Sequence, residues 1–247
     1  MYVAATTRAF SDLSFGEALR QIEDLEFDRF ELCLNEQGSE WTFSAIAERP
    51  DEHVQHLKEL TRLTPVAIDI AGDVDRVQFQ SVCRFAKLCK ITQLTIPASS
   101  TGAPYNTEID RLKDLVAIAN QESVLVSLKT QSGTLTEDPH TAAELCQSVK
   151  GLRLTLDPSY YMRGNAQTSE YDILLPHVSH THLRDSTPTE VQVMTGLGEI
   201  DYNRLISQLN KLGYRRALSV DLLPELTDKE TRGLEFRKLR LLLESLL

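Results

Sequence analysis

The sequence has few cysteines, no long apolar run and no run of basic residues. Its four cysteines are Cys33, Cys83, Cys89 and Cys146. They form no CxxC pair and fall inside predicted strands and helices, so we expect buried free thiols rather than disulfides or a zinc site. No stretch approaches the roughly 18 consecutive apolar residues of a membrane span. The N-terminus has no charged segment followed by an apolar run, so we expect a cytoplasmic protein with no membrane partner.

Positive charge is scarce as well. The chain has 26 Lys and Arg against 36 Asp and Glu, which gives a net charge of −10. Because this charge repels phosphate backbones, we expect no nucleic-acid partner. The 247 residues are 41% hydrophobic and 25% charged, which is typical of a soluble globular protein. With no linker or shift in composition, the sequence predicts a single domain over residues 1–247.

Strand-like and helix-like segments alternate along the whole chain. A Ser-x-x-Glu capping box at Ser14 to Glu17 opens the first predicted helix. An open doubly wound sheet would favour a glycine-rich phosphate loop, GxGxxG or GxxxxGK followed by Ser or Thr, and neither is present. The pattern therefore predicts an α/β fold, a (β/α)8 TIM barrel. The eight predicted strands are Met1–Thr6, Phe30–Leu34, Pro65–Ile70, Ile91–Pro97, Val124–Leu128, Leu152–Leu156, His180–Leu183 and Ala217–Asp221.

Polar residues end most of these runs, and in a barrel the carboxyl ends of the strands share one face, where active sites lie. Asp157 and His182 end two neighbouring strands, and one helix-length segment separates these strands. A carboxylate beside an imidazole suits a divalent metal or proton transfer. We expect His180 to point to the opposite face and to be structural. The predicted ring holds Glu31, Asp69, Lys129, Gln131, Asp157, Tyr160, His182, Arg184 and Asp221.

Several motifs lie in the second half of the chain. They are Leu156–Tyr160, His180–Asp185, Gly196–Tyr202, and Gly213–Tyr214 leading to Ser219–Asp221. Together they resemble those of the xylose isomerase-like barrels, a group of sugar isomerases, sugar-phosphate epimerases and family 2 apurinic endonucleases. The resemblance covers most of the chain from Val124 onward. It implies a divalent metal, commonly manganese, magnesium, cobalt or zinc, held by a Glu, an Asp, a His and a Glu on the fifth to eighth strands.

Carried onto this chain, the resemblance implies an altered metal site. Asp157 and His182 match two ligands, Asp221 replaces the eighth-strand Glu, and Lys129 stands where the fifth-strand Glu is expected. A protonated lysine cannot ligate a cation, and neighbouring carboxylates favour its charged form. We therefore expect Lys129 to take the metal's electrostatic place, and we do not favour a Schiff-base role for it. Three protein ligands remain at most, so we expect weak metal occupancy or none.

Other residues are candidates for contacts with the substrate. Gln131 stands where many relatives carry a His, and Tyr160 replaces the His that commonly follows the sixth-strand Asp. Glu31, Arg184 and Gln192 are candidates for contacts with a sugar or phosphate group.

Two functions remain open at this point. The first is a sugar or sugar-phosphate isomerase or epimerase, in which Asp157 and Asp221 act as ligand or base, His182 polarises a substrate oxygen and Lys129 completes the catalytic centre. The second is a catalytically degenerate barrel that binds a sugar-like polyol or a partner protein. An endonuclease for abasic DNA is disfavoured for two reasons. Such an enzyme needs additional His and acidic metal ligands, and the net charge of −10 of this chain repels the DNA backbone. The resemblance also suggests a homo-oligomer, either a dimer or a tetramer.

Overall fold

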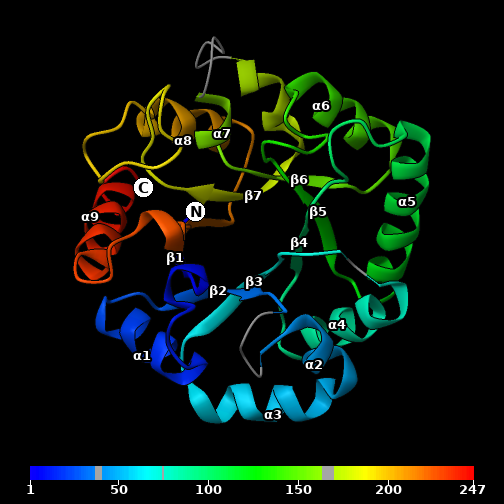
Figure 1. Cartoon of the computed structure of the whole chain (residues 1–247), viewed down its shortest axis with the longest axis horizontal. Helices are drawn as coiled ribbons and strands as arrows, with labels where there is room; N and C mark the ends of the chain where they lie inside the picture. The colour runs from blue at the N-terminus through cyan, green and yellow to red at the C-terminus, as the bar shows by residue number, and fades with distance from the viewer. Residues whose placement is uncertain (37–40, 74, 163–169) are drawn as a thin grey trace.

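Eight parallel strands close into a barrel that helices surround (Figure 1). The computed structural model describes residues 1–36, 41–73, 75–162 and 170–247. Each strand pairs with the next along the chain, and β8 closes on β1 through register pairs from Tyr2 with Ala217 to Ala5 with Val220. The predicted TIM barrel is confirmed. The strands are β1 (Tyr2–Thr6), β2 (Arg29–Leu34), β3 (Thr64–Ile70), β4 (Gln93–Ile96), β5 (Leu125–Lys129), β6 (Arg153–Leu156), β7 (Val178–Leu183) and β8 (Ala217–Val220).

The helices begin where local signals place them. Ser14 and Glu17 form the predicted capping box at the start of α1, and Asp138 caps α6 just before Pro139. The α-helices are α1 (Phe15–Asp24), α2 (Phe43–Glu48), α3 (Pro50–Leu60), α4 (Arg76–Leu88), α5 (Tyr105–Gln121), α6 (Pro139–Ser148), α7 (Ser159–Met162), α8 (Tyr202–Lys211) and α9 (Arg232–Glu244); the 3-10 helices are η1 (Arg8–Phe10), η2 (Glu170–His177) and η3 (Pro224–Leu226).

The connection between β6 and β7 differs from the single helix that the sequence suggested. It contains the four-residue α7 and, after residue 169, the 3-10 helix η2. Pro176 lies inside η2 and has no backbone N–H to donate, which disfavours a regular α-helix there.

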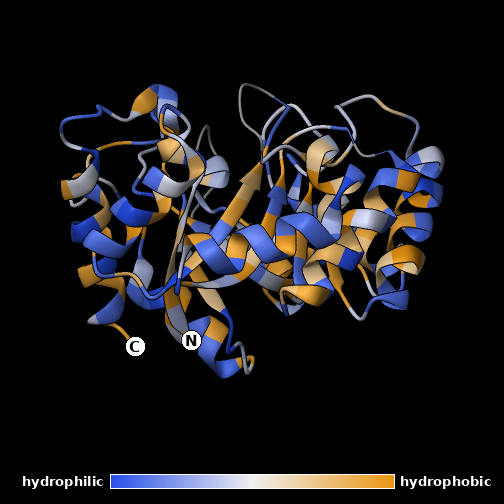
Figure 2. Ribbon diagram, turned by 90° about the horizontal axis from the view of Figure 1, so that it is seen from below, coloured by the Kyte–Doolittle hydropathy of each residue, from blue (hydrophilic) through white to orange (hydrophobic). Residues whose placement is uncertain are grey.

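Apolar side chains fill the layer between the strands and the helices, with Ile22, Phe85, Leu112 and Phe236 fully buried. Figure 2 shows hydrophobic residues on the strands and along parts of the helices, with hydrophilic residues interspersed on the helices. Burial of one stripe of each helix is the expected source of most of the stability. None of the described helices is long and apolar enough to cross a membrane.

The inside of the barrel is more polar than this layer. The Thr155 hydroxyl lies 2.8 Å from that of Thr95 and 2.6 Å from that of Ser127, and Ser179 donates to Gln93 over 2.9 Å. These residues are all buried and satisfy one another. The barrel therefore offers a hydrogen-bonding interior beneath the ends of its strands.

Candidate functional site at the carboxyl ends of the strands

Three aspartates and three basic side chains converge at the carboxyl ends of the strands. Five of the six are almost fully buried, and the sixth, Arg8, has 20% of its side chain exposed. Each comes from the end of a different strand or from the segment that follows it, so barrel closure brings them together. They are Arg8 after β1, Asp69 near the end of β3, Lys129 at the end of β5, Asp157 after β6, Arg184 after β7 and Asp221 after β8.

Arg184 lies between two of the aspartates. Its Nη2 contacts the Asp157 carboxylate and donates to Asp221 Oδ2 over 3.1 Å. Its Nε donates to the Asp221 backbone oxygen over 2.9 Å. Asp157 Oδ1 accepts from the backbone nitrogen of Ser159 over 3.1 Å and from its hydroxyl over 2.5 Å. The guanidinium therefore fills the space between the two carboxylates that a shared cation would occupy.

Lys129 and Arg8 form the remaining ion pairs with Asp69 and Asp221. Lys129 Nζ lies 3.3 Å from Asp69 Oδ2 and 3.4 Å from Asp221 Oδ2. Arg8 Nε donates to Asp221 Oδ1 over 2.8 Å, and its Nη2 contacts Asp69. Every one of the three aspartates thus has at least one basic partner. We call these six side chains the ion-pair cluster.

Burial and the charges of neighbouring side chains shift the pKa values of these groups in opposite directions. The neighbouring opposite charges have the larger effect. Burial and the positive charge of Arg8 would lower the pKa of Lys129, but Asp69 and Asp221 outweigh them and raise it. Burial would raise the pKa of Asp221, but Arg8, Lys129, His182 and Arg184 hold it well below its usual range. At neutral pH the lysine is therefore protonated and the aspartate ionised.

Glu31 lies in the middle of β2, deeper in the barrel, and it is fully buried. Its Oε2 lies 2.7 Å from His180 Nε2, and its Oε1 lies 2.8 Å from His182 Nε2. The expectation that His180 points to the opposite face is wrong, because residues two apart on a strand point to the same side. Burial would raise the pKa of Glu31, but the two imidazoles outweigh it and lower that pKa.

His182 connects this deeper group to the ion-pair cluster. Its Nδ1 has no hydrogen-bond partner among the described residues and lies 3.4 Å from Asp221 Oδ2. Burial would lower the pKa of His182, but Glu31 and Asp221 outweigh it and raise that pKa. The positive charge that this shift favours lies between the carboxylates of Glu31 and Asp221.

Tyr160 and Gln131 lie near the same end of the barrel. The Tyr160 ring in α7 has its centroid 5.4 Å from the guanidinium carbon of Arg184. Gln131 follows β5 by two residues and is half-buried, and its backbone nitrogen donates to the Thr136 hydroxyl over 3.3 Å. Both remain candidates for contacts with a bound molecule.

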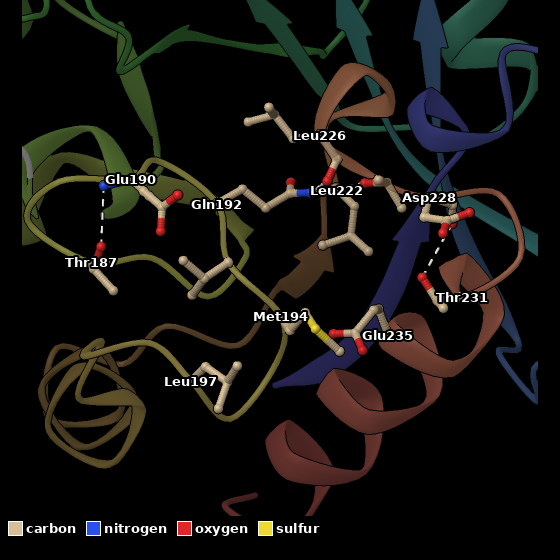
Figure 3. A pocket seen from close by; sticks show the side chains of 12 residues that line it. Thr187, Glu190, Gln192, Met194, Leu197, Leu222, Leu226, Asp228, Thr231 and Glu235 are labelled. Carbon is tan, nitrogen blue, oxygen red and sulfur yellow. Dashed lines mark hydrogen bonds between the residues drawn. The ribbon is translucent and has the colours of Figure 1, made fainter.

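Gln192 lies apart from the ion-pair cluster, in the pocket of Figure 3. This pocket has a volume of about 580 Å³ and lies between the segments 187–197 and 222–235. The Gln192 amide donates to the Leu226 oxygen over 3.2 Å and to the Thr227 hydroxyl over 2.8 Å, and it accepts from the Leu223 nitrogen over 2.7 Å. These bonds tie the two segments together.

The sequence did not predict a role for two members of the ion-pair cluster. Asp69 was placed in the ring without a partner, and Arg8 was not placed in it at all. The position of Arg8 in the sequence could have indicated a place in the ring, because Arg8 follows β1 just as Arg184 follows β7. Only the closure of β8 onto β1 brings Arg8 within 2.8 Å of Asp221.

The comparison with protein families agrees with this geometry. The family model described as "Xylose isomerase-like TIM barrel" matches residues 19–238. The chain belongs to this family. Among curated proteins, none matches it in sequence.

Solved structures of the xylose isomerase-like barrels resemble this chain over its whole length. A probable 3-DHS dehydratase, AsbF, from Bacillus anthracis is 15% identical, with a TM-score of 0.73 and 99% of each chain covered. A D-allulose 3-epimerase from Methylomonas sp. is 11% identical, with a TM-score of 0.74 and coverage of 100% of this chain and 98% of that one. At these identities the likeness shows the fold alone.

A magnesium complex is also among these structures. This xylose isomerase-like TIM barrel protein from Mycobacterium smegmatis is 15% identical, with a TM-score of 0.75 and coverage of 98% of this chain and 97% of that one. The residues at the carboxyl ends of the strands of this chain do not fit such an ion. Lys129 Nζ lies 3.4 Å from Asp221 Oδ2, and Arg184 Nη2 lies between Asp157 and Asp221. A divalent cation there would have to displace protein cations from both carboxylates.

Glu31, His180 and His182 form a second set of potential ligands, with ligand atoms within 4.8 Å of one another. Imidazole and carboxylate groups suit zinc and related metals. However, each Glu31 oxygen already pairs with an imidazole nitrogen, at 2.7 and 2.8 Å. Both carboxylate oxygens of Glu31 and the Nε2 atoms of both histidines are therefore already engaged with one another.

The glycine motif before α8 allows a close approach of the chain to Asp185. Asp185 Oδ2 accepts from the backbone nitrogens of Gly196 and Gly198 over 2.8 and 3.0 Å. A methyl group on Gly198 would lie 2.7 Å from the Ser186 nitrogen and closer still to the Asp185 carboxylate. We expect Gly198→Ala to lower the free energy of unfolding by about 1–3 kcal/mol, as overpacking does.

Urea unfolding measures this effect, and Gly72→Ala is the matched control. A methyl group on Gly72 meets nothing within 4 Å, so we expect a change within about 0.5 kcal/mol. Equal losses in the two variants would contradict the packing argument.

Stability should also depend on pH through these buried groups. The pKa values of Asp221 and Glu31 are lowered from 3.8 and 4.5, so their contribution is present above those values and is lost as the pH falls. The pKa of His182 is raised from 6.5, so its contribution is complete below 6.5 and is lost as the pH rises through the folded value. We therefore expect unfolding free energy, measured in urea at a series of pH values, to be highest between 4.5 and 6.5. A stability that rises steadily below this window would contradict the ionised state of Asp221.

Proposed function

We propose that this chain binds a small sugar-like polyol at the open end of the barrel, without a divalent metal at the family's ligand positions. It is then not a metal-dependent isomerase or epimerase. The ion-pair cluster is the observation that carries this proposal. Lys129 and Arg184 lie against the carboxylates that a metal would need, at 3.4 and 3.1 Å from Asp221 Oδ2.

The family supports a sugar-like ligand. Two of the similar structures are named as a D-tagatose 3-epimerase-like protein and a D-allulose 3-epimerase. Both names refer to the chemistry of polyhydroxylated carbonyl compounds. At the carboxyl ends of the strands, polar side chains such as Gln131 and Tyr160 are suited to contacts with hydroxyl-rich ligands.

The second candidate is a metal-independent isomerase or epimerase of a sugar or sugar phosphate. The protonated Lys129 favours it, because a fixed cation beside a substrate carbonyl stabilises a developing enediolate. This reaction also needs a free carboxylate or imidazole as base. Asp69, Asp157 and Asp221 are each paired with a basic side chain, and Glu31 with two imidazoles. The geometry therefore favours binding over catalysis.

Proton exchange distinguishes the two candidates. The protein would be incubated in deuterated water and a chelator with a panel of ketoses, aldoses and their phosphates. Saturation-transfer NMR would report binding, and loss of the signal of the proton beside the carbonyl would report catalysis. We expect binding without exchange. Exchange in the presence of chelator would favour the second candidate, and exchange only after a metal is added would contradict both.

A further inference from the structure

A cavity of about 70 Å³ lies beside Arg8, among the segments that follow β1, β2 and β3. Arg8, Asn35 and Ala71 line it from these segments, Phe15 lines it from the start of α1, and Trp41 lines it from the segment just before α2. The two aromatic rings are stacked with their centroids 4.2 Å apart. The cavity thus combines an apolar aromatic wall with a guanidinium group from the ion-pair cluster.

Arg8 retains unused hydrogen-bond donors. Its Nε and Nη2 are occupied by Asp221 and Asp69, and its Nη1 has no protein partner among the described residues. With 20% of its side chain exposed, Arg8 is also the most accessible member of the cluster. A guanidinium carries five N–H groups in a planar fork, so two donors on Nη1 remain for a ligand.

We propose that this cavity binds the carboxylate group of a small sugar acid, with Arg8 as the residue that recognises it. The inference rests on the proposed function, because it names the class of polyol that the barrel takes. The cluster balances its own charges, so an added anion meets no excess of negative charge there. A hydrogen bond from Nη1 to an anionic oxygen is charge-assisted and stronger than one to a hydroxyl.

The aromatic wall suits the remainder of such a molecule. A polyol chain carries C–H groups on its carbon skeleton, and these groups pack on aromatic rings, whereas its hydroxyls reach water or polar groups. The small volume accommodates a carboxylate and the adjoining carbon atoms rather than a whole hexose. The rest of the ligand then extends toward the open end of the barrel.

Trp41 provides a direct reporter, because it is the chain's single tryptophan and lines the cavity. Its fluorescence would be followed during titration with glucuronate, with glucose as the matched neutral sugar, and with inorganic phosphate, all in chelator at constant ionic strength. We expect a saturable change with glucuronate at concentrations about 10-fold or more below those needed for glucose or phosphate. Equal responses to glucuronate and glucose would overturn the inference, as would tighter binding of phosphate.

Two variants connect the response to this cavity. Arg8→Lys keeps a positive charge beside Asp69 and Asp221 but removes the Nη1 donors, so glucuronate binding should weaken by about 10-fold or more. Ala71→Leu narrows the cavity and leaves every ion pair in place, which covers the case in which Arg8→Lys unfolds. Arg84→Lys on the exposed surface of α4 is the control. Unchanged binding of glucuronate to folded Ala71→Leu would overturn the inference.

These outcomes separate the two proposals. Polyols that bind by NMR without preference for a carboxylate would overturn only the role of the Arg8 cavity. An absence of any polyol binding, or binding that requires a divalent metal, would overturn the proposed function itself.

Discussion

Replacing Arg184 with methionine should lower the free energy of unfolding by about 3–5 kcal/mol, because removal of one partner leaves buried charges uncompensated. Arg184 is fully buried, and its Nη2 contacts Asp157 and lies 3.1 Å from Asp221 Oδ2. Both carboxylates would lose a donor in a site that water does not reach. Urea unfolding at neutral pH measures the loss.

An exposed ion pair is the matched control for Arg184→Met. Arg84 lies 2.9 Å from Asp51, and both side chains are more than half exposed. Arg84→Met should therefore change stability by at most about 1 kcal/mol. The double variant Arg184→Met with Asp157→Asn should recover part of the loss, because it removes one uncompensated charge. A loss for Arg184→Met no larger than that for Arg84→Met would contradict the proposed importance of the cluster.

Replacing Lys129 with glutamate should allow a divalent metal to bind where the Lys129 ammonium now lies, between Asp69 and Asp221. The substitution removes a cation 3.3 Å from Asp69 and 3.4 Å from Asp221 and adds a carboxylate at the same position. Without metal we expect a loss of stability of about 3–5 kcal/mol or more, since a buried partner is lost and like charges are added. With manganese at about 100 times its dissociation constant, binding should return about 2.7 kcal/mol.

Lys129→Met separates loss of the cation from gain of a ligand. It should be destabilised, but manganese should not restore it, because methionine is a poor ligand for a hard cation. Thermal unfolding with and without manganese measures both effects. The expected metal binding is contradicted if the two variants respond alike to the metal. Metal binding by Lys129→Glu without proton exchange on sugars would further favour the binding function.

The barrel could be predicted because its signals are local. Most strands are short runs that are apolar or alternate apolar with polar residues, and motifs such as Ser14 to Glu17 mark where a helix begins. The connection that contains η2 was harder to predict, because a segment with Pro176 inside it has no clear helical or strand periodicity. The general position of Asp157, His182 and Asp221 also followed from the ends of the strands.

The pairing within the centre could not be predicted in the same way. Arg184 was assigned to a sugar or phosphate contact, whereas in the structure its Nη2 contacts Asp157 and Asp221. Arg8 and Asp221 are separated by 213 positions in sequence and meet only when the barrel closes. His180 was misplaced by an error in strand periodicity. Partners across a barrel depend on side-chain direction and length, which the sequence of a single strand does not contain.

Metal content is the measurement that decides whether the centre works without a metal. Protein purified without chelator would be analysed for metals as isolated and again after separate loading with manganese, magnesium, cobalt and zinc. We expect far less than one equivalent of each, because Lys129 and Arg184 already neutralise the carboxylates. Retention of about one equivalent of a divalent metal by the unaltered protein, lost in Asp157→Asn or Asp221→Asn, would contradict the metal-free centre.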